Sequence, residues 1–134
     1  MNGWKDLATL IGRILLVVIF LMSGTGKIGN FTGTTQYMAK HGMPMVTFFA
    51  LGAIFLELAG GLSVVLGYFA RFGALLLIVF LIPTTLIFHG HVADPGQKIH
   101  FLKNVSMFGG LLILLSSGPG RISLDYLLRG KRRG

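Results

Sequence analysis

The sequence predicts an all-α integral membrane protein, a four-helix bundle with both termini in the cytoplasm. The chain of 134 residues is 53% hydrophobic and 12% charged, with a mean hydropathy of +0.77. Charged residues make up about a quarter of an ordinary soluble domain, so this composition favours the bilayer. Four apolar segments are long enough to cross it as helices, and they lack the alternation of membrane β-strands. We expect one domain over residues 1–134.

The predicted spans are separated by short connections. Gly67 is a helix stop, and the brief turn after it makes the second and third spans antiparallel neighbours. Pro83 lies inside the third span, and Gly118-Pro119-Gly120 ends the fourth. Short helices are expected in the first loop (34–41), on the outer membrane surface, and in the tail after residue 123. The spans cover residues 7–26, 45–66, 72–89 and 99–117, followed by a basic cytoplasmic tail at 121–134.

Lysine and arginine positions predict the orientation. The side that holds more of them is expected to be cytoplasmic. The first segment could instead be a cleaved signal peptide, but Arg13 would interrupt its apolar region. The termini and second loop carry Lys5, Arg71, Arg121, Arg129, Lys131, Arg132 and Arg133, whereas loops one and three carry only Lys27, Lys40, Lys98 and Lys103.

Composition also narrows the classes of function. The chain has no cysteine, which excludes disulfides, thiolate metal sites and a dithiol redox centre of its own. The net charge of +8 includes a basic tail after the last span, so it indicates membrane lipids as partners and no nucleic acid. No glycine-rich loop has the context of a nucleotide site, and no nucleophile has an adjacent base. A stand-alone enzyme is not expected.

Two charged residues lie inside the predicted spans. Glu57 is placed near the bilayer centre, where a lone carboxylate is costly, and Arg13 is expected at a similar depth on an antiparallel helix. We predict that Arg13 and Glu57 form an intramembrane ion pair. The pair could simply fix helix register, or Glu57 could relay protons or bind a polar head such as a quinone carbonyl. Alternatively, Arg13 could extend to the cytoplasmic surface and leave Glu57 protonated.

A second group of polar residues is expected near the outer surface. These ligand-binding candidates could surround a quinone or, as a lower-ranked choice, a haem. A metal site is not predicted, because no two histidines have the spacing i, i+4 of a helical metal site. Interfacial histidines bonded to water and lipid are the simpler explanation. The candidates are Ser23, Lys27, His89, His91, Lys103 and Asn104, with His100 at the same level and His41 above them.

Short motifs along nearly the whole chain resemble those of a known family. They are Gly12-Arg13, Ser23-Gly24-x-x-Lys27, Gly42-x-Pro44, Glu57-x-x-Gly60-Gly61, Leu66-Gly67-x-x-x-Arg71, Phe88-His89, Lys103-Asn104 and Gly118-Pro119-Gly120-Arg121-x-Ser123-Leu124-Asp125. Together they resemble the DoxX family of small bacterial inner-membrane proteins, closest to its YphA-like members. The resemblance implies a four-helix bundle in the bacterial inner (plasma) membrane. The matching polar positions are Arg13, Lys27, Glu57, His89 and Asn104.

The resemblance also suggests a role in redox chemistry. The family name comes from the quinone-linked membrane subunit of a thiosulfate oxidoreductase, and some members are associated with redox-stress complexes. We therefore expect a membrane subunit that supports a quinone-linked or redox-stress oxidoreductase, with protein partners in a membrane complex or as a homo-oligomer. The alternative is a non-catalytic accessory or assembly module of a larger complex. A transporter is a weaker third hypothesis, because no inverted repeat is evident.

Overall fold

The computed structural model describes residues 3–88 and 95–133. Within these ranges the chain forms helices and no strands, so the all-α prediction is confirmed. The helices are α1 (Gly3–Gly29), α2 (Phe31–Lys40), α3 (Val46–Leu66), α4 (Ala70–Phe88), α5 (Pro95–Ser117) and α6 (Leu124–Arg133).

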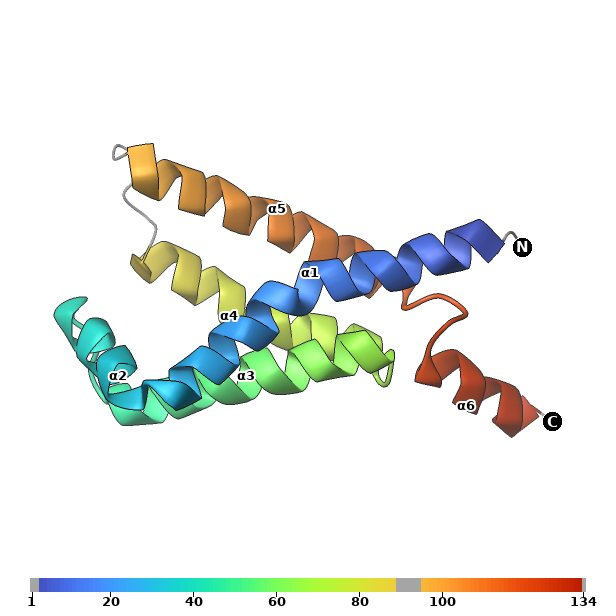
Figure 1. Cartoon of the computed structure of the whole chain (residues 1–134), viewed down its shortest axis with the longest axis horizontal. Helices are drawn as coiled ribbons and strands as arrows, with labels where there is room; N and C mark the ends of the chain where they lie inside the picture. Colours follow the sequence, from blue (N-terminus) through green and yellow to red (C-terminus); the bar gives the residue numbers. More distant parts are fainter. Residues whose placement is uncertain (1–2, 89–94, 134) are drawn as a thin grey trace.

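Four of these helices, α1, α3, α4 and α5, are long and apolar enough to cross a membrane, which confirms the predicted four-helix membrane bundle. Large apolar side chains such as Leu15, Met22 and Ile113 are exposed on the outside, as a lipid-facing surface requires. Both ends of the chain lie at the same end of the bundle (Figure 1). The orientation of that end toward the cytoplasm stays a prediction from the lysine and arginine counts.

Helix α3 packs against both α1 and α4, and α5 packs against α4 (Figure 1). Glycines make the contact between α3 and α4 close, because a Cβ on Gly60 or on Gly73 would lie 3.0 Å from the other residue's carbonyl oxygen. On the other face of α3, Gly61 contacts Leu21 of α1. The buried core between the helices comprises Val17, Phe20, Val64, Ala74, Leu77, Ile78, Leu81, Leu111 and Leu114.

Helix α4 continues through Pro83, as expected for its span. Proline has no N–H, so the carbonyl of Val79 loses its helical donor. The next two residues turn their hydroxyls back onto the helix: Thr84 Oγ1 donates to the Phe80 carbonyl at 2.8 Å, and Thr85 Oγ1 donates to the Leu81 carbonyl at 2.7 Å. Both hydroxyls are thereby satisfied within the helix, on the two carbonyls that follow Val79.

The predicted tail helix is present as α6, and Asp125 attaches it to the turn between α3 and α4. The Asp125 carboxylate accepts hydrogen bonds from the backbone N–H groups of Phe69 (2.6 Å) and Ala70 (2.9 Å), at the start of α4. The Asp125 N–H donates to the Gly67 carbonyl at 2.8 Å. The carboxylate therefore caps α4 while the backbone closes this end of the bundle.

Candidate functional site

The polar centre of the bundle is an ion pair between α1 and α3. Lys27 Nζ lies 2.6 Å from Glu57 Oε1 and also donates a hydrogen bond of 2.6 Å to Ser23 Oγ, one turn earlier on α1. The Glu57 side chain is only 1% exposed, whereas that of Lys27 is 22% exposed. Both predicted side chains are therefore inside the bundle, and the lysine is the more accessible of the two.

Close packing between α1 and α3 explains why the pair forms here. A Cβ on Gly24 would lie 3.4 Å from the Cβ of Glu57 and 2.8 Å from side-chain atoms of Leu58, so only glycine lets the helices approach at this level. Ser23 and Lys27 are four residues apart and share the face of α1 next to this contact. The sequence Ser-Gly-x-x-Lys thus combines a close approach with a cation that reaches the acid on α3.

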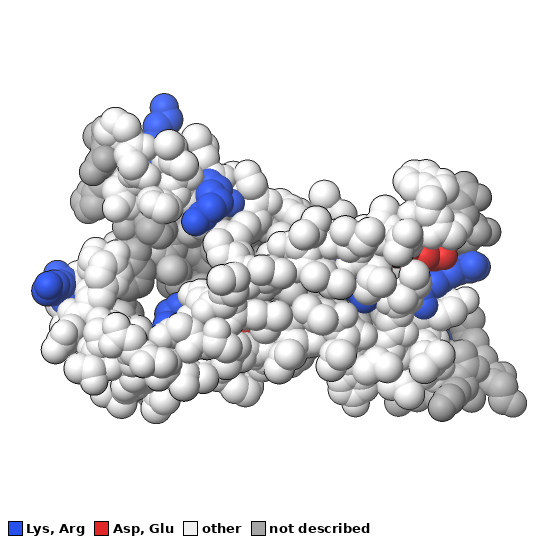
Figure 2. Space-filling view, viewed as in Figure 1, with Lys and Arg blue, Asp and Glu red and all other residues white. Residues whose placement is uncertain are grey.

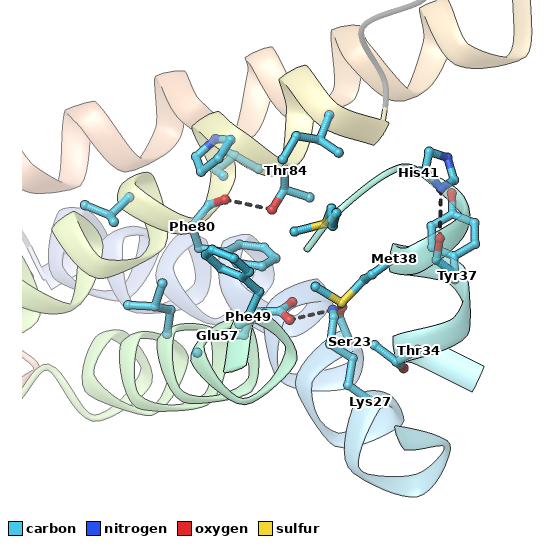
Figure 3. A pocket seen from close by; sticks show the side chains of 18 of the residues that line it. Ser23, Lys27, Thr34, Tyr37, Met38, His41, Phe49, Glu57, Phe80 and Thr84 are labelled. Carbon is cyan, nitrogen blue, oxygen red and sulfur yellow. Dashed lines mark hydrogen bonds and ion pairs between the residues drawn. The ribbon is translucent and has the colours of Figure 1, made fainter. Parts of the chain in front are cut away.

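A pocket of about 800 Å³ adjoins the ion pair and is walled by α1, α2, α3, α4 and α5. Figure 3 shows Glu57, Lys27 and Ser23 together at one side of it, with side chains from α2, α3 and α4 around the remaining space. Lys27 Nζ also lies 5.5 Å from the centre of the Phe80 ring, a cation–π contact. Apart from its polar side, the wall is largely apolar.

Helix α2 forms one wall of this pocket. Its side chains Thr34, Tyr37 and Met38 line the space, and Met38 is buried (Figure 3). The helix was expected to lie on the membrane surface, where its aromatic residues would contact lipid headgroups. It also packs against α3 and lines the pocket that Lys27 and Glu57 adjoin.

A buried hydrogen bond joins α4 and α5 at the far side of the pocket. Asn104 Nδ2 donates to Thr85 Oγ1 at 2.9 Å, and both side chains are buried. Asn104 was one of the predicted ligand-binding candidates, and in the structure its amide bonds to Thr85. Pro83 and Val79 of α4 also line the pocket, so the carbonyl that proline leaves without a helical donor belongs to a lining residue.

The predicted pair between Arg13 and Glu57 is wrong. Arg13 is buried, as expected of a residue facing the bundle, but it bonds to backbone oxygens at the other end of the molecule. Its Nη1 donates to the Pro119 carbonyl at 2.6 Å, and its Nη2 donates to the Val65 carbonyl at 3.3 Å. The Nε atom is buried without a hydrogen-bond partner. Arg13 therefore ties α1 to the end of α3 and to the segment after α5.

The error lies in the register of α1 against α3. The prediction assumed that the outer ends of the two helices are level. Instead, Gly24 near the end of α1 faces Glu57 in the middle of α3. Arg13 is three turns earlier on α1, roughly 16 Å further along the axis at 1.5 Å per residue. At that distance no arginine side chain can reach Glu57.

The other predicted polar residues divide into three groups. Ser23, Lys27, His41 and Asn104 line the pocket. Lys103 and His100 are exposed on α5 and are not among the lining residues. His89 and His91 lie outside the described residues. Within residues 3–88 and 95–133, no group of three or more His, Asp or Glu side chains is placed to hold a metal ion.

Sequence reasoning missed the aromatic and backbone parts of the site. Phe49 and Phe80 line the pocket, yet each looks like any other apolar residue of a span. It also missed Pro119 as the acceptor for Arg13, although a Gly-Pro-Gly stop leaves carbonyls without helical donors. The spacing of Ser23 and Lys27 was a usable signal, because a lysine one turn after a serine shares its helical face.

Comparisons with known proteins agree with this architecture. The DoxX family model matches residues 8–90. The chain is 37% identical to the inner membrane protein YqjF of Escherichia coli (strain K12) over 131 residues, which cover 98% of this chain and 99% of the relative. It is 42% identical to the inner membrane protein YphA of the same strain over 127 residues, covering 90% of each chain.

A more distant relative carries a functional name. The chain is 30% identical over 140 residues to a Bacillus subtilis (strain 168) protein named "Putative oxidoreductase CatD", with 100% of this chain and 97% of the relative covered. No solved structure matches the chain. The family match, the two inner-membrane relatives and the four spanning helices together show that this chain belongs to the DoxX family and is a multi-pass protein of the bacterial inner membrane.

Proposed function

We propose that the pocket beside Lys27 and Glu57 binds the head of a lipophilic quinone, and that the protein is the membrane subunit of a quinone-linked oxidoreductase. The observation that carries the proposal is a buried ion pair at the polar side of a largely apolar pocket within the bundle. The name of the Bacillus subtilis relative also supports an oxidoreductase context.

The walls of the pocket suit an aromatic, membrane-dissolved ligand. Phe49, Phe80 and Tyr37 line it, and aromatic faces of this kind stack on a quinone ring. Phe48 and Val79 also line the pocket and are 65% and 53% exposed on the outside of the bundle. The space therefore extends to the lipid-facing surface, and a hydrophobic tail can remain among the acyl chains.

The ion pair provides a donor for a quinone carbonyl. A lysine ammonium has three N–H donors, and here Ser23 and Glu57 accept two of them. The third N–H has no acceptor among the hydrogen bonds of Lys27 within the described residues, and the side chain is partly accessible, so this donor is available to a ligand. Lys27 would orient the ligand, and Glu57 would keep the lysine in place and hold a proton close to the ligand oxygen.

A partner protein would supply the electrons. The chain is cysteine-free and has no thiol redox centre, so reduction of a bound quinone calls for a donor protein beside the pocket. In this proposal the small bundle holds the quinone and its proton donors, while the partner carries the redox group. Cross-linking in intact membranes tests for this partner: we expect a cross-linked product with a redox protein, and recovery of the protein alone would contradict this part of the proposal.

The test is the quinone content of the gently purified full-length protein. Solvent extraction followed by chromatography measures the molar ratio of quinone to protein and of quinone to phospholipid. We expect a quinone-to-phospholipid ratio at least several-fold above that of the parent membrane. A ratio equal to that of the membrane would contradict the proposal.

Variants show whether the ion pair holds the quinone. Removing one charge leaves the other unpaired, so the informative change is Lys27→Met with Glu57→Leu, which removes both charges at similar volume. We expect the double variant to fold and its quinone affinity to fall by about tenfold, which corresponds to about 1.4 kcal/mol of lost binding free energy. The matched control is Lys103→Gln, an exposed lysine outside the pocket. Undiminished quinone in the folded double variant would overturn the assignment.

A further inference from the structure

A second pocket, of about 720 Å³, lies at the opposite end of the molecule, where both termini are found. Its wall comes from four parts of the chain: the start of α1, the start of α4, the segment between α5 and α6, and α6 itself. The spanning helices α1 and α4 contribute residues from their first turns, and α5 contributes its last residue, Ser117. The pocket therefore lies at the level where the spanning segments leave the membrane, far from Lys27 and Glu57.

Four basic side chains line this pocket: Lys5, Arg71, Arg121 and Arg129. In the described part of the chain, none of the four has a carboxylate within ion-pair distance. Figure 2 shows basic side chains gathered beside acidic ones at this end of the molecule. The chain thus brings together cations from α1, α4, the α5–α6 segment and α6 without neutralising them pairwise.

The acids of the pocket only partly offset this charge. Two carboxylates, Asp6 and Asp125, line it, so four positive and two negative groups leave a net charge of +2. Asp125 is occupied by the N–H groups at the start of α4. A further negative group is the natural complement of such a site, since unpaired cations close together repel one another.

Apolar side chains continue the pocket toward the membrane. Phe69 and Phe72 line it next to the cations and are 59% and 60% exposed. Phe72 belongs to the spanning helix α4, so its exposed ring is on the surface that lipid chains contact. A ligand that fills this pocket would place negative charge among the cations and an apolar part along the start of α4.

We propose that this second pocket binds the phosphate group of an anionic phospholipid, with the acyl chains against Phe69 and Phe72. Arginine matches phosphate because its planar guanidinium donates two parallel hydrogen bonds to phosphate oxygens. A free phosphate shares this headgroup chemistry but lacks the chains that the two phenylalanines would contact. The site is separate from the quinone pocket and does not depend on that proposal.

The test uses the full-length protein in a neutral detergent, titrated with phosphatidylglycerol or phosphatidylcholine of identical acyl chains and followed by native mass spectrometry. We expect phosphatidylglycerol to bind about 25-fold more tightly, because each basic side chain strengthens anionic lipid binding by roughly fivefold and the net charge of the pocket is +2. Inorganic phosphate at millimolar concentration is expected neither to bind nor to displace the lipid. Displacement by phosphate would overturn the lipid assignment and identify a free-phosphate site.

A matched pair of variants locates the binding. Lys5→Gln with Arg129→Gln removes two cations that make no hydrogen bond or ion pair with described residues, so folding is preserved. The control is Lys40→Gln with Lys98→Gln, which removes the same charge at the other end of the bundle. We expect the first variant to weaken phosphatidylglycerol binding by about tenfold or more, and the control to leave it unchanged. If both double variants weaken phosphatidylglycerol binding equally, the effect comes from the net charge of the protein, and the proposed site is wrong.

Discussion

Two cations on the same face of α1, the buried Arg13 and the partly buried Lys27, have different roles in this bundle. Arg13 contacts only backbone carbonyls among its hydrogen-bond partners, from Val65 and Pro119. Lys27 contacts a carboxylate and a hydroxyl, and it is partly accessible from a pocket of about 800 Å³. Arg13 ties helices together at one end of the bundle, whereas Lys27 forms an ion pair at the edge of a pocket.

The comparison shows that a charge inside a membrane helix does not by itself identify a functional site. An intramembrane ionisable residue is a reasonable functional candidate because it is costly to bury. For Arg13, hydrogen bonds to the carbonyls of Val65, at the end of α3, and of Pro119, after α5, offset that cost, and Arg13 is not among the lining residues of either pocket described above. Lys27 differs from Arg13 because it lines a pocket and forms an ion pair with Glu57.

The largest expected effect comes from breaking the charged pair on one side. Lys27→Met leaves Glu57 without its cation in a low-dielectric interior, and we expect the free energy of unfolding to fall by about 3 to 5 kcal/mol. Lys27→Met with Glu57→Leu should restore most of the loss, because no charge is then unpaired. Thermal unfolding in mild detergent, followed by circular dichroism, compares the two. Equal stability of the single and double variants would contradict a buried pair.

Arg13→Met tests the structural cation. It leaves the carbonyls of Val65 and Pro119 without a donor, and we expect a loss of about 2 to 3 kcal/mol in the free energy of unfolding. The same thermal measurement applies, with quinone content as the second readout. If Arg13 acts only at its end of the bundle, the quinone retained per folded protein stays unchanged. If quinone is lost in parallel, Arg13 also affects the quinone pocket, and the idea that it acts only at its own end of the bundle is wrong.

A smaller effect is expected from Gly67→Ala, next to Arg13. Gly67 has a φ of +70°, and an added Cβ would lie 2.3 Å from the Cβ of Ser123. The left-handed conformation alone costs a non-glycine residue roughly 1 to 2 kcal/mol. The control, Gly26→Ala, lies in α1 with no heavy atom within 4 Å of the added Cβ. A melting temperature lowered by Gly67→Ala and not by Gly26→Ala supports the close contact with the tail.

The smallest effect is expected at Asp125, the cap of α4. Asp125→Ala removes the acceptor for two backbone N–H groups, and we expect a loss of about 1 kcal/mol, the usual value for a helix N-cap. Asp125→Asn keeps one acceptor oxygen and should lose less. Faster proteolysis of the tail in Asp125→Ala than in Asp125→Asn is the accompanying readout. Similar proteolysis of both variants and the original protein would mean that this cap does not hold the tail.

Much of the fold could be predicted because its signals are local. Each span is a continuous apolar run, and Gly67 and the Gly-Pro-Gly stop mark helix ends through their own backbone preferences. Arg13, Val17, Phe20 and Gly24 recur along α1 at helical spacing, and all four are buried. Helical periodicity identifies which side of a helix faces inward without any knowledge of its neighbours.

The candidate site could be predicted only in part. Glu57 was predicted inside the bilayer, and Ser23, Lys27 and Asn104 were predicted as ligand-binding candidates near the outer surface. All four line one pocket. Their pairing was not found, because a hydrophobic span can slide past its neighbour with little change in apolar burial. Gly24 against Glu57 and Leu58 sets the register, and that is a contact between distant parts of the chain.

The sequence by itself determined the membrane setting, the four helices, their inward faces and the polar residues that need partners. These properties depend on composition, periodicity and helix-stop residues, which act over a few turns of chain. Only the tertiary structure decided that Glu57 meets Lys27 rather than Arg13, that α2 walls a pocket, and that the tail returns to α4. Those outcomes depend on how far each helix is displaced along its neighbour, and close packing at a few glycines sets that displacement.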